Sequence, residues 1–285
     1  MKIKKNIYDY KIDLNSDTAP ARVVRLVGKG KRVLEVGAGP GSITKVLSSS
    51  SNCRVTALDI DAESIKMVAP FCERAYQANL NDIAWPEVLG KDNKFEVLVA
   101  ADVLEHVYEP LAVLKTMKGL LDENGCIILS IPHAGHSVIQ ACLFDEDFEY
   151  GDFGLLDHTH IRFFGVKNIQ KMIEDAGLKI IHAEFVVVNP LNTEFSERWV
   201  NTPKKLRKAL ASNPFGMVYQ VIVKVKPVDA DGHPVTLINL SVSPQKITYR
   251  ETLRAYLRLN LSSKMYSRIL EINKLRHKYF VKKKS

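Results

Sequence analysis

The segment that most constrains the fold of this 285-residue chain runs from Arg32 to Gly41 and reads RVLEVGAGPG. Its first half is short, apolar and rich in β-branched residues, which is typical of a buried strand in a parallel sheet. The glycines that follow predict a tight loop whose backbone can approach a ligand closely. The residues from Ser42 to Ser48 predict the helix behind that loop, so the segment indicates the strand, loop and helix unit of an α/β fold.

The spacing of the glycines and the acidic residues around them indicate which ligand the loop binds. In a dinucleotide-binding loop the third glycine falls one place later, at Ser42, and a pyrophosphate lies at the helix N-terminus. Glu35 would repel such a phosphate and suits a cationic ligand instead. Asp59 follows about 20 residues after the glycines, where its carboxylate can accept both ribose hydroxyls. A glycine turn that binds no ligand is the alternative.

Strand-like and helix-like segments alternate along the chain, which predicts a doubly wound, mostly parallel α/β sheet. Strands are expected at about residues 32–36, 54–59, 73–77, 95–100, 125–131, 179–188 and 217–225. Helices are expected over residues 19–27, capped by Ser16-Asp17-Thr18, over 110–121, ended by Asn124-Gly125, and over 166–177.

The segment Ala100-Ala101-Asp102-Val103-Leu104-Glu105-His106-Val107 directly follows the fourth predicted strand. Together with the glycine loop and Asp59, it resembles the donor-binding half of class I S-adenosylmethionine-dependent methyltransferases. The resemblance implies a seven-stranded Rossmann-like sheet with two antiparallel final strands, and it places Asp102 near the donor. Where the family often carries an acidic residue near the adenine amino group, this chain has Asn79, whose oxygen can accept the same bond. The expected donor-binding residues are Glu35, Gly37, Ala38, Gly39, Gly41, Asp59, Ile60, Asn79, Leu80 and Asp102.

Asp102, Glu105 and His106 have the spacing that puts three side chains on one face of a helix, and they are candidate ligands for a divalent metal. The same segment resembles that of ubiquinone-pathway O-methyltransferases, in which acidic and histidine residues at this place have been linked to metal binding. The alternative is that Glu105 stabilises a helix N-terminus and His106 packs or bonds locally. Because the spacing shows no further ligand, we favour the alternative, and S-adenosylmethionine is the expected cofactor.

A third block begins at the strand end Ser130-Ile131-Pro132 and leads through an insertion, residues 135–164, to the segment Asp157-His158-Thr159-His160-Ile161-Arg162-Phe163-Phe164. It resembles a group of bacterial methyltransferases associated with cell-surface polysaccharide synthesis, and the resemblance covers about residues 15–226. It implies a sugar or glycan acceptor. Residues 189–215 are long for a compact connection and are expected to form a lid over the substrate.

Five of the eight histidines follow strands whose ends should face the donor: His106, His133, His136, His158 and His160. Since histidine has an ordinary pKa of about 6.5, this cluster predicts a general base for a hydroxyl acceptor. We expect His160 to be the base and Asp157 to orient a histidine or the hydroxyl, with His133 and His158 as further catalytic candidates. The expected substrate-binding residues are Arg162, through its planar guanidinium, and His136. A hydrogen-bonded structural role is the alternative for each histidine.

Charge and cysteine content bear on where the chain works. The net charge of +8 is concentrated near the end, since residues 245–285 hold twelve lysines or arginines and two acidic residues. The four cysteines form no C-x-x-C pair and no apolar leader follows the first residues, which predicts reduced thiols and a cytoplasmic protein. No apolar run approaches the roughly 18 residues of a membrane-spanning helix, so any membrane contact is expected to be peripheral.

Two regions are predicted: a methyltransferase domain over residues 1–228 and a basic amphipathic helical extension over residues 229–285. Apolar and basic residues recur at near-helical spacing between Tyr249 and Lys284, which favours peripheral contact with the inner face of a membrane. Packing on the domain or on a second subunit of a homo-oligomer is the equally weighted alternative. Nucleic-acid binding is not favoured, because no stacking module or recognition motif is present.

The sequence predicts an S-adenosylmethionine-dependent O-methyltransferase that acts on a sugar, sugar nucleotide or glycan with a histidine base. The alternative acceptor is a quinone precursor or another small phenolic metabolite, with metal assistance from Asp102, Glu105 and His106. A further alternative is a non-catalytic scaffold that keeps the cofactor fold and acts through its basic tail. The acceptor, the position methylated and the oligomeric state are left open by the sequence.

Overall fold

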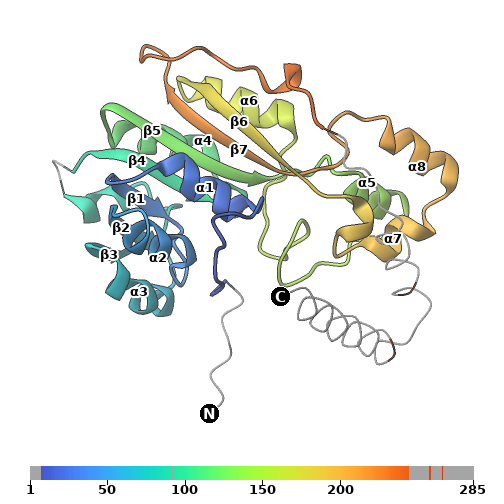
Figure 1. The fold of residues 1–285 in the computed structure, drawn as a ribbon, viewed down its shortest axis with the longest axis horizontal. Helices are drawn as coiled ribbons and strands as arrows, with labels where there is room; N and C mark the ends of the chain where they lie inside the picture. The colour runs from blue at the N-terminus through green and yellow to red at the C-terminus, as the bar shows by residue number, and fades with distance from the viewer. Residues whose placement is uncertain (1–7, 91–92, 244–256, 258–264, 266–285) are drawn as a thin grey trace, which may run out of the picture.

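The computed structural model describes residues 8–90, 93–243, 257 and 265. Its centre is a seven-stranded sheet with the order β3-β2-β1-β4-β5-β7-β6 (Figure 1). The strands are β1 (Arg32–Val36), β2 (Arg54–Asp59), β3 (Arg74–Gln77), β4 (Phe95–Ala101), β5 (Leu121–Pro132), β6 (Leu178–Val187) and β7 (Val218–Pro227). The pairs among β1 to β5 are parallel, whereas β7 lies antiparallel between β5 and β6. The predicted doubly wound sheet with two antiparallel final strands is confirmed.

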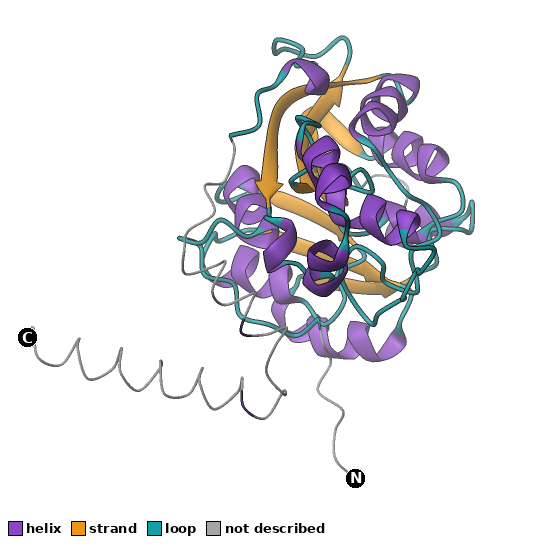
Figure 2. Cartoon of the chain, turned by 90° about the vertical axis from the view of Figure 1, so that its right-hand side faces the viewer, coloured by secondary structure: helices purple, strands orange, loops and turns teal. Residues whose placement is uncertain are grey.

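Helices cover both faces of the sheet, because its parallel strands are apolar on both sides (Figure 2). Val33 and Val55 face one helical layer, and Leu34 and Leu98 face the other. One layer contains α1 (Ala19–Val27), α2 (Ser42–Ser49) and α3 (Ala62–Val68), and the other contains α4 (Pro110–Gly119) and α6 (Val166–Asp175). Short 3-10 turns are η1 (Ala69–Phe71), η2 (Trp85–Leu89), η3 (Leu104–His106), η4 (Pro190–Asn192) and η5 (Leu237–Asn239).

Two local predictions from turn and cap residues were wrong. Thr18 precedes α1 as expected, but its side chain makes no capping hydrogen bond. Asn124-Gly125 does not end a helix: α4 already stops at Gly119, and both residues lie inside β5. They occupy an irregularity in the pairing of β4 with β5, where a Cβ at Gly125 would come within 3.0 Å of the Phe95 carbonyl oxygen. The glycine is required there by a close backbone approach.

The insertion after β5 and residues 189–215 pack together at one end of the sheet (Figure 1). The insertion contains α5 (Ser137–Phe144), and the later segment contains α7 (Ser196–Asn201) and α8 (Lys204–Ala211). Apolar side chains from both segments form a separate buried cluster: Val138, Ile139, Ala141, Cys142, Leu155, Leu156, Phe195 and Trp199. The segment expected as a lid is therefore packed on the insertion, and its movement stays a prediction.

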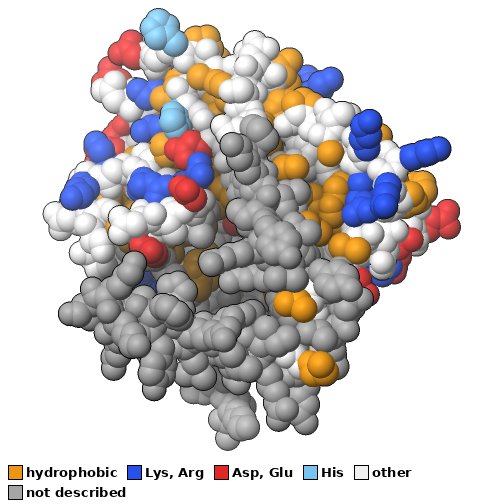
Figure 3. All heavy atoms as spheres, turned by 45° about the vertical axis from the view of Figure 1, so that its right-hand side comes forward, with side chains coloured by type: hydrophobic (Ala, Val, Ile, Leu, Met, Phe, Trp, Pro, Cys, Tyr) orange, Lys and Arg blue, Asp and Glu red, His pale blue; other side chains and the backbone are white. Residues whose placement is uncertain are grey.

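The first part of the predicted extension folds back onto the sheet. The amide of Val235 donates to the carbonyl of Ile180 on β6 at 2.8 Å, and Leu237 is fully buried. Of the amphipathic pattern over residues 249–284, all but residues 257 and 265 lie outside the described residues. Within the described part of the chain, no helix is long and apolar enough to cross a membrane. On the face drawn in Figure 3, Lys and Arg side chains lie among exposed hydrophobic ones, and peripheral membrane contact stays a prediction.

The glycine loop after β1 depends on backbone conformations that favour glycine. Gly37 and Gly41 have φ angles of +67° and +86°, in the left-handed region. A Cβ at Gly37 would lie 2.5 Å from a methyl group of Val103, and one at Gly41 would lie 2.6 Å from a methyl group of Val68. The loop therefore packs closely between the segment after β4 and the end of α3.

We expect Gly41→Ala to lower the free energy of unfolding by about 1 to 3 kcal/mol, because it adds left-handed strain to a contact with Val68. Gly119→Ala is the matched control, since no atom lies within 4 Å of its added Cβ. Urea unfolding followed by circular dichroism measures both. Equal stability of the two variants would contradict this account of the loop.

Candidate active site

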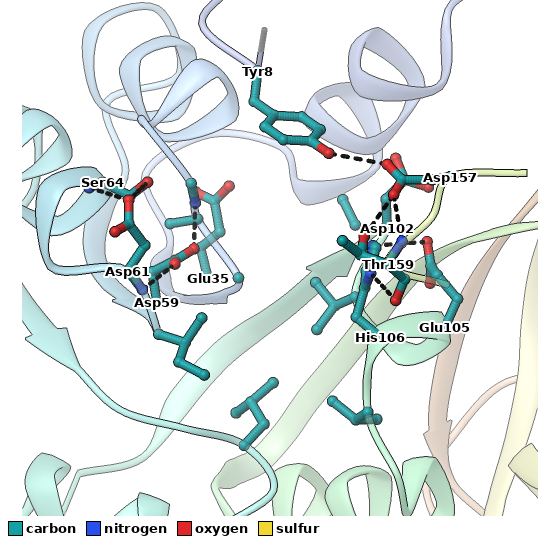
Figure 4. Close-up of a pocket in the computed structure, with 18 of the residues that line it drawn as sticks. Tyr8, Glu35, Asp59, Asp61, Ser64, Asp102, Glu105, His106, Asp157 and Thr159 are labelled. Atoms are coloured by element: carbon teal, nitrogen blue, oxygen red, sulfur yellow. Dashed lines mark hydrogen bonds and ion pairs between the residues drawn. The ribbon is translucent and has the colours of Figure 1, made fainter. Parts of the chain in front are cut away.

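A cavity of about 690 Å³ opens at the carboxyl ends of β1, β2 and β4. This is the edge at which doubly wound sheets bind their ligands. Nine of the ten expected donor-binding residues line it: Glu35, Gly37, Ala38, Gly39, Asp59, Ile60, Asn79, Leu80 and Asp102. The remaining one, Gly41, shapes the loop without lining the cavity. The acidic side chains fall into two groups, with Glu35 and Asp59 at one end and Asp102 and Glu105 at the other (Figure 4).

The end of the cavity beside the glycine loop has acceptors suited to a cation and to a diol. Glu35 is 3% exposed, and its carboxylate accepts a hydrogen bond from the Thr44 hydroxyl at 2.5 Å. Burial raises the pKa of Glu35 to about 8, although the Thr44 bond acts in the opposite direction. The two Asp59 oxygens accept from the amides of Gly39 and Asp61, at 2.7 and 2.8 Å. Each oxygen keeps a free lone pair, so the carboxylate is held in place and can still accept two ribose hydroxyls.

Asn79 forms part of the wall where an adenine is expected. Its Oδ1 accepts the amide of Asn81 at 3.0 Å, which fixes the side chain and leaves one lone pair on the oxygen. Ala78 and Leu80, its neighbours, line the cavity with apolar side chains, and Ile60 does so from the end of β2. An amide oxygen between apolar side chains suits a flat nitrogen heterocycle.

At the other end, Asp102 follows β4 in a strained conformation, with a φ angle of +57°. Its carboxylate accepts a hydrogen bond from the Gln220 side chain on β7, and burial raises its pKa to about 7. The three expected metal candidates do not share a helix face. Only Leu104 to His106 form a short 3-10 turn, and Asp102 precedes it. The group of possible metal ligands is instead Glu105, His106 and His160, whose ligand atoms all lie within 4.8 Å of one another.

Glu105 is the most unusual side chain of the site. It is fully buried, and within the described residues neither carboxylate oxygen has a hydrogen-bond partner. Its Oε1 lies 4.0 Å from Nε2 of His106 and 3.9 Å from Nε2 of His160. Burial, reinforced by the nearby Asp102, raises the pKa of Glu105 well above its usual range. A buried carboxyl group without partners is disfavoured as the bare anion, so binding of a proton or a cation stabilises it.

Hydrogen bonds to the other ring nitrogens fix which nitrogen of each histidine carries the proton. The Thr159 hydroxyl lies 2.6 Å from Asp157, to which it donates, so it can only accept from Nδ1 of His106 at 3.0 Å. Nδ1 of His160 lies 3.3 Å from the Leu155 carbonyl oxygen, to which it donates. In the neutral rings both Nε2 atoms then carry lone pairs facing Glu105. Burial, followed by the neighbouring His106, lowers the pKa of His160, which keeps that ring neutral at pH 7.

His133 and His136 lie outside the cavity, contrary to the catalytic and substrate-binding roles expected of them. Nδ1 of His133 donates to the Val218 carbonyl at 3.0 Å. Nε2 of His136 donates to the Val188 carbonyl at 2.9 Å, and its Nδ1 accepts from the amide of Val138 at the start of α5. Burial lowers the pKa of His136 to about 4, so the ring stays neutral. These two rings join the insertion to the end of the sheet.

His158 and Arg162 also lie outside the residues that line the cavity. The His158 side chain is 59% exposed, and its Nδ1 lies 3.1 Å from the Gly151 carbonyl oxygen. The Arg162 guanidinium donates from Nε and Nη2 to the Tyr108 carbonyl, at 3.1 and 2.6 Å. Neither side chain therefore reaches the cavity, where a catalytic role was expected for His158 and a substrate-binding role for Arg162.

Several residues that line the cavity were not expected from the sequence. Tyr8 and Tyr10 reach it from the N-terminal segment, Tyr219 and Gln220 from β7, and Phe153 from the insertion. The lining has a strong bias in charge. It includes six carboxylates, Glu35, Asp59, Asp61, Asp102, Glu105 and Asp157, and among the described residues that line it none is lysine or arginine.

A seven-stranded sheet of this order with a donor cavity at its carboxyl edge defines a class I methyltransferase fold. Residues 13–183 match the family model described as a methyltransferase domain, and the chain belongs to that family. It is an S-adenosylmethionine-dependent methyltransferase, as predicted, and Glu35, Asp59 and the glycine loop fit that donor.

Relatives of known name are ubiquinone biosynthesis O-methyltransferases. The protein from Coxiella burnetii is 26% identical over 172 residues, which cover 59% of this chain and 71% of the relative. The protein from Actinobacillus pleuropneumoniae is 22% identical over 178 residues, which cover 60% and 74%.

Solved structures share the fold at low identity. The S-adenosylmethionine-dependent methyltransferase from Mesorhizobium loti has a TM-score of 0.51 and 14% identity, covering 75% of this chain and 99% of that one. The one from Archaeoglobus fulgidus has a TM-score of 0.50 and 15% identity, covering 73% and 92%.

We expect the affinity for S-adenosylmethionine to rise between pH 6 and 7.5, by up to about tenfold per pH unit. The free protein holds a proton on Glu35, because its pKa is raised to about 8, and the cationic donor favours the ionised carboxylate. Calorimetric titration over this pH range measures the slope. Glu35→Gln should flatten it, and Glu63→Gln, an exposed carboxylate paired with Lys66, should not. A slope that persists in Glu35→Gln would contradict the assignment.

Proposed function

We propose that this methyltransferase transfers a methyl group to a hydroxyl oxygen of a small uncharged aromatic acceptor, of the kind found in quinone precursors. The observation that carries the proposal is the convergence of Glu105 Oε1 with the Nε2 atoms of His106 and His160 at the acceptor end of the cavity. These groups all accept protons or cations, which suits a bound hydroxyl that must lose its proton. The names of the two relatives support the same acceptor class.

His160 is the proposed proton acceptor. S-adenosylmethionine supplies an electrophilic methyl group, and the chain's own contribution is to align the acceptor oxygen and remove its proton. The Leu155 carbonyl holds the His160 ring through Nδ1, so Nε2 can take the proton. The Oε1 of Glu105 lies 3.9 Å away, so a positive charge on the ring favours ionisation of Glu105, and the ionised form in turn stabilises the imidazolium. Asp157 acts on the neighbouring ring, because it orients Thr159 and thereby His106.

The charge of the cavity favours an acceptor without phosphate or carboxylate groups. A sugar nucleotide would bring its phosphates close to the carboxylates of Asp59, Asp61 and Asp157, with no lysine or arginine in the described lining to offset the repulsion. Arg162, which was expected to bind the substrate, donates to the Tyr108 carbonyl outside the cavity. A neutral sugar or glycan, expected from the segment Asp157 to Phe164, finds no support among the relatives.

The same three side chains also fit a divalent metal, which is a second candidate use of this centre. Two imidazole nitrogens and one carboxylate form a common catalytic ligand set that leaves positions open for an acceptor oxygen. Both rings are oriented through Nδ1 by hydrogen bonds to the chain, as in known metal sites. A metal bound there would lower the pKa of the acceptor hydroxyl. His160 would then be a ligand instead of the base, and Asp102 would remain bonded to Gln220.

The acceptor class is tested by incubating the full chain with methyl-labelled S-adenosylmethionine and three acceptors in parallel. These are a catechol-type phenol, a neutral oligosaccharide and a nucleotide sugar. We expect a labelled methyl ether of the phenol and no labelled nucleotide sugar, because the cavity repels phosphate. Label in a sugar product with an unlabelled phenol would contradict the proposal.

We expect His160→Ala to lower kcat by about 100-fold or more while the affinity for S-adenosylmethionine changes little, since removal of a general base costs roughly that much. His158→Ala is the control, because that ring is exposed and lies outside the cavity. Calorimetric titration with Zn²⁺ and Mn²⁺, followed by assays with a chelator, separates the two uses of the centre. Loss of activity on chelation, with metal binding that Glu105→Gln abolishes, would replace the base role of His160 by the metal role.

A further inference from the structure

Residues 8–10 lie over the cavity as a short segment whose two tyrosines line it. Asp9, between them, turns instead toward Lys45 on α2. Figure 4 shows Tyr8 between the group around Glu35 and Asp59 and the group around Asp157. The segment therefore lies between the donor half and the acceptor half.

On the donor side, the segment is attached to the first turn of α2. The hydroxyl of Ser42 donates to the Tyr8 carbonyl at 2.7 Å and accepts from the Tyr10 amide at 3.0 Å. Lys45 forms an ion pair with Asp9 at 2.9 Å. Ser42 directly follows the glycine loop, so the segment is tied to the part of the chain that holds the donor.

On the acceptor side, the segment begins a chain of hydrogen bonds. The Tyr8 hydroxyl donates to Oδ2 of Asp157 at 3.1 Å. Oδ1 of Asp157 accepts from the amide and the hydroxyl of Thr159, at 2.8 and 2.6 Å. Nδ1 of His106 in turn lies 3.0 Å from the Thr159 hydroxyl and 3.1 Å from the Thr159 carbonyl oxygen, and it donates to both. Hydrogen bonds through the Asp157 and Thr159 side chains thus connect Tyr8 to the His106 ring, which faces Glu105.

We propose that Tyr8 is a positioning residue that couples closure of residues 8–10 over the methyl donor to the orientation of His106. With the segment closed, both Asp157 oxygens have partners and the Thr159 hydroxyl is directed at Asp157, so its oxygen accepts from Nδ1 of His106 and holds the ring in one orientation. When the segment opens to admit or release the donor, Oδ2 of Asp157 loses the Tyr8 bond and the constraint on Thr159 weakens. The importance of His106 rests on the proposed function, whereas the closure does not.

The protonation states of Tyr8 and Asp157 suit this contact. Burial, followed by the charge of Asp157, raises the pKa of Tyr8 to about 12, so its hydroxyl remains a donor at neutral pH. Burial acts to raise the pKa of Asp157, but hydrogen bonds from Thr159 and Tyr8 outweigh it and lower that pKa. The carboxylate therefore remains an acceptor, and the contact is a charge-assisted hydrogen bond.

Tyr8→Phe removes the hydroxyl and keeps the ring. We expect S-adenosylhomocysteine, the demethylated donor, to dissociate about fivefold faster from this variant, as one hydrogen bond from a half-exposed hydroxyl to a buried carboxylate contributes roughly that factor. Stopped-flow displacement measures the rate. In protein labelled with ¹⁵N-histidine, the His106 ring signals, assigned with His106→Gln, should shift in Tyr8→Phe, because the hydrogen bond from Nδ1 to the Thr159 hydroxyl weakens while the bond to the Thr159 carbonyl remains. Tyr150→Phe removes a similarly exposed hydroxyl outside the cavity and should match the wild type in both measurements.

Each outcome decides part of the proposal. Unchanged dissociation in Tyr8→Phe would overturn the closure, and faster dissociation with unchanged His106 signals would overturn the coupling. Ser42→Ala detaches the segment at its other end and should reproduce both effects with the Tyr8 hydroxyl intact. Because product release and ring signals need no acceptor, a failure of the proposed phenolic acceptor leaves these results unaffected and is recognised separately.

Discussion

The register of the parallel strands around β1 is the constraint on which the site depends. Val36 pairs with Leu58 on β2 and with Ala100 on β4, so the three strands end at the same level. Their following loops open at one edge, and the parallel pairing of the strands sets this arrangement. Acidic residues widely separated in the sequence are thereby brought to one cavity, although desolvation and mutual repulsion would keep them apart in a less constrained chain.

The buried carboxylates carry a cost that the apolar layers of the sheet offset. Glu35, Asp102 and Glu105 are all held where burial raises the pKa, so the ionised form of each is disfavoured in the free protein. A cationic ligand stabilises the ionised form of these side chains, and a ligand that supplies protons stabilises the neutral form. The buried carboxyl groups therefore lower the stability of the protein when the site is empty, and binding of a ligand restores it. A cationic donor is favoured over a neutral compound of similar shape for this reason.

How far the sequence predicted the site depends on how local each contact is. The predicted donor residues Glu35, Gly37, Gly39 and Asp59 line the cavity, because they belong to one contiguous strand, loop, helix and strand pattern over residues 32–59. His160 lies at the cavity as expected, whereas His133 and His136, which were expected there too, do not. Only the fold shows that these two rings bond to the Val218 and Val188 carbonyls. Asp102 does not join the other two predicted metal ligands. The prediction assumed a helix through all three residues, whereas the chain makes a 3-10 turn that begins after Asp102.

Tyr8 could not be found from the sequence. It meets Asp157 across 149 positions, and no local pattern marks either residue for the other. Gln220 and Asp102, 118 positions apart, are a second contact of this kind. The strands, by contrast, were located from periodicity because each alternates or runs apolar within a few residues.

The separate buried cluster under α5 and α7 has a consequence for how such an enzyme diversifies. Phe195 and Trp199 pack with Leu155 and Leu156 instead of with the apolar layers of the sheet. Sequence changes in that cluster would reshape the wall around Phe153 and Gly154 while the folding of β1, β2 and their helices continued undisturbed. The two halves of the catalyst therefore have separate evolutionary freedom: one side can be refitted to new chemistry while the other keeps delivering the same methyl group.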